Sequence, residues 1–365
     1  MKIYEIITAL EKLAPPVYQE NYDNCGLLTG NKSWECTGII CTLDTLENTI
    51  EEAFEKKCNL IVSHHPIIFK GLKNLTNNSY VERTLIKAIK NDIAIYAIHT
   101  NLDNILNGVN NYLGERIGLR NPTILAPKKE LLSKLFTYVP TTHADIVREA
   151  LFKAGAGNIG NYNECSFNVT GTGTFKPGKN TAPFIGETNG ERETVEETKI
   201  EVIFPSFLQN SILKALFTNH PYETVAYEIV QLQNKFQEVG SGLLGYLPES
   251  LSENEFLTLV KKAFGLQVIK HTQLLGKPIK KIAVCGGSGS FLTQQAIASG
   301  ADVYITSDVK YHEFFDADNH LLLLDIGHWE SEQFTIDLLH NYIQEIFPTF
   351  AVLKTAVNTN PVRYF

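Results

Sequence analysis

The sequence predicts an α/β core that is split by an inserted α+β domain, and three observations lead to this prediction. Short apolar segments alternate with amphipathic helical segments near the N-terminus, and the same alternation returns near the C-terminus. Apolar runs of this kind are typical of mainly parallel sheets covered on both faces. The middle of the chain lacks this alternation. We therefore expect a discontinuous α/β core, residues 1–130 and 238–365, around an inserted domain, residues 131–237.

The N-terminal half of the core is predicted to begin with a helix, because the apolar residues between Ile3 and Leu13 follow helical spacing. Strand and helix then alternate. We predict strands at Gly38–Leu43, Asn59–Ser63 and Ile93–Ile98, and helices at Leu46–Phe54, Tyr80–Ile89 and about Ile105–Ile117.

The C-terminal half of the core repeats the pattern of strand followed by helix. We predict strands at Lys281–Cys285, Asp302–Thr306 and Leu321–Ile326. The helices that follow them are expected at Phe291–Ala298, from about Lys310, and from about His328 to Ile346.

The middle of the chain has a different order of elements. We predict strands at Leu135–Val139, Ser166–Thr172 and Lys199–Phe204, helices at Ala144–Lys153 and Leu208–Phe217, and a strand or helix at Thr224–Gln231. The polar stretch Gly173–Thr198 is interpreted as a long exposed loop. The order β-α-β-β-α-β is that of a small, ferredoxin-like α+β sandwich.

Composition excludes several classes of protein. The chain has 365 residues, with 40 Asp and Glu against 32 Lys and Arg, so its net charge is −8 and nucleic-acid binding is not supported. No segment approaches the roughly 20 apolar residues of a membrane span, and the stretch MKIYEIITALEKLAPP does not have the apolar h-region expected of a signal peptide. The six cysteines form no CxxC pair, so we expect reduced thiols in a cytoplasmic protein.

Candidate metal ligands follow three predicted strands of the core. His64 and His65 follow the first, Asp103 lies shortly after the second, and His328 and Glu332 follow the third. Ligands of α/β sheets bind beyond the carboxyl ends of parallel strands, so we expect these ends to meet at one edge. His328 and Glu332 are four residues apart at the start of a helix and share one face, whereas Glu330 points elsewhere.

Five such ligands exceed what one catalytic zinc usually takes from a protein, and they suit two divalent ions about 3.5–4 Å apart. Because His64 and His65 are adjacent, they must lie where the strand becomes a loop or bind different ions. Zinc is expected first, with manganese, iron, cobalt or nickel as alternatives. Two ions and two carboxylates leave a positive residual charge, which favours hydrolysis of a small anionic or nucleotide-like molecule.

Several further residues have more than one interpretation. Asp308 and His312 are four residues apart after the strand Asp302–Thr306 and could transfer protons, or they could be a helix cap and a surface histidine. His99 could be a ligand, a residue behind the ligands or a packing residue. Gly286–Ser290 favours a tight turn over a phosphate-binding loop, and Asp23 and Asn24 favour a turn over a place in the site.

Taken together, these motifs identify the chain as similar to the NIF-three-like family, whose bacterial members are often labelled GTP cyclohydrolase 1 type 2 homologs. The segments that carry the resemblance span both halves of the core: YDNCGLLTG (Tyr22–Gly30), SHHP (Ser63–Pro66), HTNLD (His99–Asp103), GGSGS (Gly286–Ser290), SDVKYH (Ser307–His312) and GHWESE (Gly327–Glu332). One departure is Tyr22, where the family has Trp.

The resemblance implies a dinuclear metal site on the five residues named above and a toroidal homohexamer. It also implies that the insert, which contains NHPYETVAYEI (Asn219–Ile229), is PII/CutA-like. We therefore expect a metal-dependent hydrolase with two divalent ions per chain and no other cofactor. The alternative is a non-catalytic metal-binding or regulatory interaction protein; an open coordination position would favour the enzyme.

Overall fold

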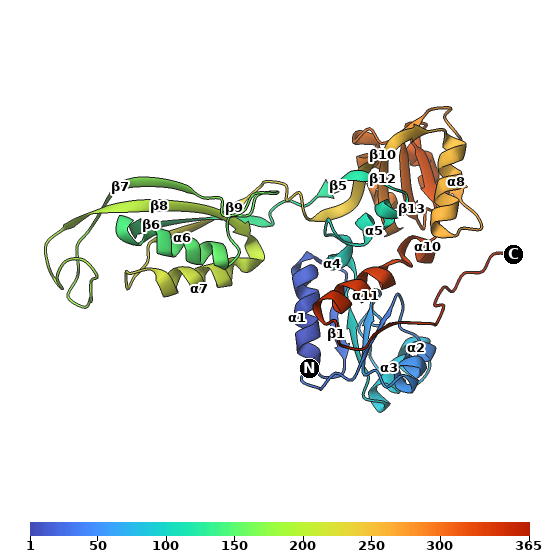
Figure 1. Ribbon diagram of the computed structural model, residues 1–365, viewed down its shortest axis with the longest axis horizontal. Helices are drawn as coiled ribbons and strands as arrows, with labels where there is room; N and C mark the ends of the chain where they lie inside the picture. Colours follow the sequence, from blue (N-terminus) through green and yellow to red (C-terminus); the bar gives the residue numbers. More distant parts are fainter. The chain divides into compact units, whose positions relative to one another are not determined.

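The computed structural model describes residues 1–365, and the chain divides into two compact units (Figure 1). The first, called the core here, comprises Met1–Pro127 and Glu238–Phe365, and the second, called the inserted unit, comprises Lys128–Gln237. No helix has the length and apolar character needed to cross a membrane.

One sheet of the core has five strands in the order β1-β4-β3-β2-β15. These strands are Gly26–Thr29, Ala94–Ala97, Leu60–Ser63, Ile39–Thr42 and Val352–Lys354. All pairs are parallel except β1 with β4. Helices α2 (Glu47–Glu55) and α3 (Tyr80–Lys90) pack on one face, whereas α11 (Thr335–Ile346) packs along β2 and β15 and contacts α1 (Ile3–Leu13).

The second sheet of the core has six strands in the order β11-β14-β13-β12-β10-β5. They are Lys270–His271, Leu322–Asp325, Val303–Ser307, Ile279–Ser288, Gly240–Leu251 and Arg120–Pro127. Helices α5 (Val109–Arg116) and α8 (Glu253–Phe264) close one apolar layer, and α9 (Thr293–Ala298) with the 3₁₀ helix η5 (Tyr311–Ala317) closes the other. Figure 1 shows the two sheets of the core one above the other.

The core is a mixed α/β fold, and the prediction of mainly parallel sheets is right only for the first sheet. In the second sheet β12, β13 and β14 are parallel, but β5, β10 and β11 join antiparallel. The antiparallel strands were missed because β10 carries polar and glycine residues between its apolar ones, which weakens the strand pattern.

The ligand-bearing strands also belong to two sheets rather than to one edge of one sheet. Strands β3 and β4 lie in the first sheet and β14 lies in the second. The helix predicted from His328 to Ile346 is interrupted as well, into α10 (His328–Glu332) and α11. The helix predicted at Ile105–Ile117 begins only at Val109, after the short α4 (Thr100–Asp103).

The inserted unit is a four-stranded antiparallel sheet, β7-β8-β6-β9, with two helices. Its strands are Phe167–Phe175, Glu193–Pro205, Leu132–Pro140 and Tyr227–Leu232, and its helices are α6 (Ala144–Lys153) and α7 (Gln209–Asn219). The predicted loop Gly173–Thr198 is shorter than expected, because β7 and β8 extend into it as a paired ladder up to Phe175 and Glu193. A PII/CutA-like character of this unit stays a prediction.

Excision of the inserted unit is the first testable prediction. Pro127 and Gly240 are paired across β5 and β10, so the two ends of the core adjoin where the insertion departs. Replacing residues 128–237 by a short Gly/Ser linker should leave a soluble core that unfolds cooperatively in thermal circular dichroism. Insoluble product at every linker length tested would show that the core needs the insert to fold.

Candidate metal centre

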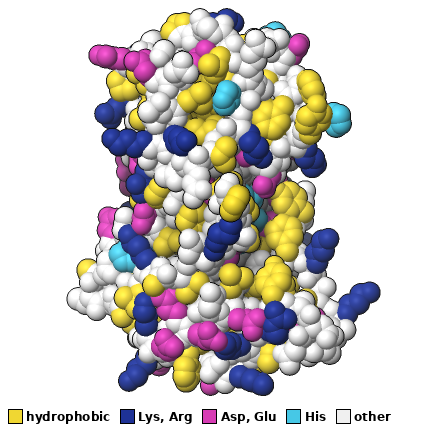
Figure 2. All heavy atoms as spheres, turned by 90° about the vertical axis from the view of Figure 1, so that its right-hand side faces the viewer, with side chains coloured by type: hydrophobic (Ala, Val, Ile, Leu, Met, Phe, Trp, Pro, Cys, Tyr) yellow, Lys and Arg dark blue, Asp and Glu magenta, His cyan; other side chains and the backbone are white.

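A single cavity of about 830 Å³ in the core receives the ends of strands from both sheets. The first sheet contributes Asp44, His65 and Asp103, and the second contributes Asp308, His328 and Glu332. Four residues of the last segment of the chain line it as well, namely Asn360, Pro361, Val362 and Tyr364. Figure 2 shows hydrophobic side chains gathered around the middle of one face of the molecule, with a histidine among them.

His64 and His65 directly follow β3, at the point where the strand gives way to a turn. Their backbone amides still donate to the carbonyls of Thr42 and Leu43, which extends the pairing with β2 by two residues. The two imidazole rings lie 5.0 Å apart at an angle of 46°. The transition from strand to loop therefore lets both adjacent histidines reach the same cluster.

Glu332 joins the histidines of both sheets, and its side chain is only 3% exposed. Its Oε2 lies 2.9 Å from His65 Nε2 and 3.1 Å from His328 Nε2. Its Oε1 lies 4.0 Å from His64 Nε2, which in turn lies 3.5 Å from Asp103 Oδ1. Each carboxylate oxygen thus faces a different group of side chains.

Four histidines of the cluster share one orientation: Nδ1 is bound to an oxygen, and Nε2 is left as the available ring donor. The Nδ1 partners are the Ile98 carbonyl for His64 at 2.9 Å, Asp44 for His65 at 2.7 Å, Asp308 for His328 at 2.6 Å and Asp23 for His99 at 2.9 Å. Metal-binding histidines almost always have such a partner on their second nitrogen, because it fixes the ring and its tautomer.

The spacing of the donors fits a metal ion. His65 Nε2 and His328 Nε2 lie 3.4 Å apart, and two nitrogens bound tetrahedrally to one zinc ion lie ~3.4 Å apart. His64 Nε2 is fully buried and has no hydrogen-bond partner, although a buried polar atom without one is costly. Burial lowers the pKa of His64 to about 3, so its ring is neutral, as a ligand must be.

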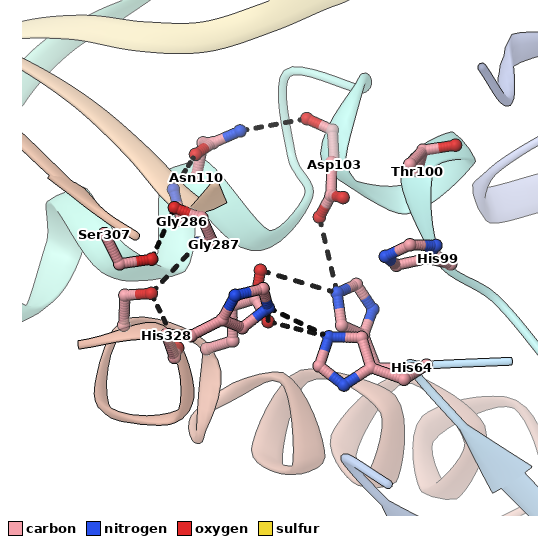
Figure 3. Close-up of polar contacts among 12 residues, drawn as sticks. His64, His99, Thr100, Asp103, Asn110, Gly286, Gly287, Ser307 and His328 are labelled. Atoms are coloured by element: carbon pink, nitrogen blue, oxygen red, sulfur yellow. Dashed lines mark hydrogen bonds and ion pairs between the residues drawn. The ribbon is translucent and has the colours of Figure 1, made fainter. Parts of the chain in front are cut away.

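Three groups of side chains have donor atoms close enough to hold an ion: His65, His328 and Glu332; His64, Asp103 and Glu332; and His64, His65 and His99. The first two groups contain all five residues predicted as ligands. Figure 3 shows Asp103 above His64, with His328 and His99 on opposite sides of the cluster.

The charges of the cluster are strongly coupled. Burial by itself would lower the pKa of His65, but Asp44 and Glu332 raise it to about 10. Burial opposes the same change at His328, where Glu332 and Asp308 raise the pKa to about 11. Burial and the negative charge of Glu332 raise the pKa of Asp103 well above its usual range. Without an ion, this site therefore takes up protons in place of metal.

The three candidates for proton transfer, Asp308, His312 and His99, differ in where they lie relative to the cluster. Asp308 precedes η5 and binds His328, so it does not share a helix face with His312. His312 is exposed, contacts the rings of Tyr311 and Phe315, and does not line the cavity, so the expected role beside the metals has no support. His99 lies in the cluster, 5.3 Å from the ring of His65.

Two carboxylates that hold histidines were missed or undervalued in the sequence. Asp44 lies just past the carboxyl end of β2, and the rule that selected the other strand ends would have found it. Asp23 was interpreted as a turn residue, but it binds His99 and also the hydroxyl and backbone amide of Thr100. Thr359 donates to Asp44 at 2.6 Å, and no sequence pattern indicated this contact from the end of the chain.

The glycine-rich segment Gly286–Ser290 is not the tight turn that the sequence favoured, because Gly286 to Ser288 form the end of strand β12 and Ser290 begins a 3₁₀ helix. The first two amides of the segment are already used. Gly286 N donates to Asn110, and Gly287 N donates to Ser331 (Figure 3). Gly287 has a φ of +61°, and an added Cβ would collide with Glu332. The glycine at this position of β12 lets the backbone approach the carboxylate closely.

The charge count made from the sequence is too positive for the cavity as a whole. Seven carboxylates line it against one lysine, Lys270, which is itself paired with Asp325 at 2.6 Å. Two divalent ions would therefore leave the cavity two charges negative rather than positive when its histidines are neutral. The sequence showed only two of these carboxylates as ligands.

Comparisons with known proteins find relatives that match this chain over nearly its whole length. A model of the Duf34/NIF3 (NGG1p interacting factor 3) family matches residues 1–361. A GTP cyclohydrolase 1 type 2 homolog of Halalkalibacterium halodurans is 43% identical over 88% of this chain and 87% of its own, and one of Staphylococcus epidermidis is 34% identical over the full length of both. The crystal structure of a Bacillus cereus protein related to NIF3 has a TM-score of 0.88 at 36% identity, covering 100% of this chain and 99% of its own.

The protonation of this cluster predicts how the stability of metal-stripped protein depends on pH. A histidine whose pKa is raised on folding stabilises the native state below about 6.5, and this contribution is lost as pH rises toward the folded values of about 10 and 11. The urea concentration at the midpoint of unfolding should therefore decrease as the pH rises from 6.5 to 8. Asp44→Asn, which removes one cause of the raised pKa of His65, should make this slope shallower. An unchanged slope would contradict the account.

Proposed function

The chain belongs to the Duf34/NIF3 family, and we propose that it is a metal-dependent hydrolase with a dinuclear centre of divalent ions. The observation that carries this proposal is the common orientation of the histidines, each anchored through Nδ1, around the two oxygens of Glu332. A cluster built only to form ion pairs has no need of a buried, unpartnered nitrogen such as His64 Nε2.

The two groups of donors suggest how two ions are held. His65 and His328 would hold one ion with Oε2 of Glu332, and His64 and Asp103 would hold the other with Oε1. Imidazole and carboxylate ligands without a thiolate suit zinc first, and manganese, iron, cobalt or nickel next. Bound ions of this kind supply Lewis-acid chemistry and an activated water for hydrolysis.

The surrounding residues of the chain hold and orient the ligands. Asp44 and Asp308 fix the rings of His65 and His328 and keep their Nε2 atoms directed at the centre. His99 is placed to move a proton, because Asp23 holds its Nδ1 and its ring lies 5.2 Å from that of His64. It is the proton-transfer candidate that the geometry supports.

Access to the centre favours an enzyme over a closed storage or structural site. His65 and His328 are 22% and 38% exposed toward the cavity, so solvent and a small molecule can reach the donors.

The nucleotide-like class of substrate rests on the name of the relatives, GTP cyclohydrolase 1 type 2 homolog. A homohexamer rests on the family resemblance alone, and light scattering should then give the mass of six chains.

Substitution of Gly287 tests the metal centre without touching a ligand. The added methyl group of Gly287→Ala must displace the carboxylate of Glu332, whereas in Gly286→Ala the nearest atoms are Val109 Cγ1 at 3.3 Å and Glu332 Cγ at 3.4 Å. By elemental analysis we expect two divalent ions per chain in the wild type and in Gly286→Ala, and the loss of at least one in Gly287→Ala. Equal metal content in the two variants would sink the bridging role of Glu332.

Turnover by metal-replete protein is the test of hydrolysis. Assays against nucleosides, nucleotides and phosphoesters should find a rate that rises with pH through the neutral range, because the imidazoles must be neutral to bind metal. Asp308→Asn should weaken metal binding by about 10- to 100-fold, since it frees the ring of His328. His312→Ala, outside the cavity, is the control and should leave the rate unchanged. A rate that is equal at acid and neutral pH would refute the mechanism.

A further inference from the structure

The cavity beside the metal centre has an unusual surface: aromatic and aliphatic side chains are left exposed in it. Six of the exposed large apolar residues of the chain line this one cavity, namely Tyr22, Phe69, Val268, Phe291, Val362 and Tyr364. Their exposed fractions run from 41% to 65%. Apolar side chains gathered around one concave site mark a place where a ligand buries them.

Two of these aromatic residues, Phe69 and Tyr22, lie next to the candidate metal centre. The ring of Phe69 lies 6.0 Å from that of His99, whose ring lies 5.2 Å and 5.3 Å from those of His64 and His65. The centre of the Tyr22 ring lies 6.3 Å from the centre of the Phe69 ring, and the planes of the two rings make an angle of 35°. The two rings are tilted rather than stacked on each other, and Tyr22 is 65% exposed, so ring surface is free for a flat ligand.

The charges around these rings oppose a polyanion. The wall of the cavity carries carboxylates from Glu20, Asp325 and Glu330 besides those of the metal centre, and no arginine lines it. Its only lysine is engaged with Asp325, and the amides of Gly286 and Gly287 donate to side chains rather than into an open loop. The basic side chains and free loop amides that proteins use to bind a triphosphate are therefore missing or occupied, and the carboxylates outnumber the charge that two divalent ions would bring.

From these observations we propose that Tyr22 and Phe69 form a binding site for a flat heteroaromatic ring, and that the ligand is an uncharged nucleoside-like molecule rather than a nucleoside triphosphate. This inference rests on the proposed function for the role of the ligand as substrate. The binding itself stands on the cavity alone and can be measured without turnover.

Calorimetric titration of full-length, metal-loaded protein tests the order of affinities. The probes are guanosine, adenosine, cytidine and thymidine, together with the mono- and triphosphate of guanosine. We expect at least one nucleoside to bind, and guanosine to bind at least as tightly as its monophosphate and more tightly than its triphosphate. Tightest binding by the triphosphate, or no binding by any nucleoside at millimolar concentration, overturns the proposal.

Substitutions separate the ring-binding site from other roles of the same residues. Tyr22→Ala and Phe69→Ala should each weaken binding of the preferred nucleoside by about five- to 100-fold while the metal content stays at the wild-type value. Tyr311→Ala is the matched control, because Tyr311 is 74% exposed but lies outside the cavity, and it should change nothing. Unchanged affinity in both cavity variants, or a changed oligomeric mass in place of a changed affinity, overturns the assignment.

Failure of this proposal can be told apart from failure of the proposed function. A protein that binds nucleosides through Tyr22 and Phe69 but hydrolyses none of the assayed compounds supports the ring-binding site and counts against the hydrolase. A protein that hydrolyses one of these compounds, but binds nucleosides equally well in the wild type and in Tyr22→Ala and Phe69→Ala, supports the hydrolase and counts against the ring-binding site.

Discussion

The carboxylate of Glu332 is the contact on which the arrangement of the site depends. It is almost fully buried and comes from the second sheet, yet one of its oxygens lies 2.9 Å from His65 of the first sheet. Burying a carboxylate is costly unless charged or hydrogen-bonding groups surround it, and here the three imidazoles do so. The absent side chain at Gly287 follows from the same constraint, since any Cβ there would occupy the place of the carboxylate.

The histidines in turn impose requirements on more distant segments. Each needs a partner for its Nδ1, and these partners come from the ends of β2 and β13, the backbone after β4 and the segment before β1. Thr359, near the end of the chain, then binds Asp44. Segments that lie far apart in the sequence are thus connected to one cluster, which explains why the motifs are spread over the whole core.

Residues whose placement follows from local rules could be predicted from the sequence. Strand ends and the i,i+4 spacing identified His64, His65, Asp103, His328 and Glu332, and the structure brings their donor atoms together. The role of Asp23 could not be predicted, because its contact with His99 joins residues 76 positions apart and a turn explains the same local sequence. The pairing of ligand-bearing strands into two sheets was also out of reach, since periodicity identifies strands but not their neighbours.

The cavity adds a constraint that the motifs do not contain. Ligand residues alone suggest a positive centre, but the wall that surrounds them is acidic and aromatic. The proposed pair of divalent ions would attract the reacting group of a substrate, while the carboxylates of the wall disfavour further negative charge. Selectivity of this kind would come from the shape and charge of the cavity. The family motifs describe only the residues around the metal centre and not the rest of the cavity wall.

The central claim is that the cluster around Glu332 holds two divalent ions, and anomalous X-ray diffraction from crystals of metal-loaded protein tests it most directly. The account predicts two anomalous peaks about 3.5–4 Å apart, one beside His65 and His328 and one beside His64 and Asp103, with Glu332 between them. A single peak, or peaks away from Glu332, would contradict it.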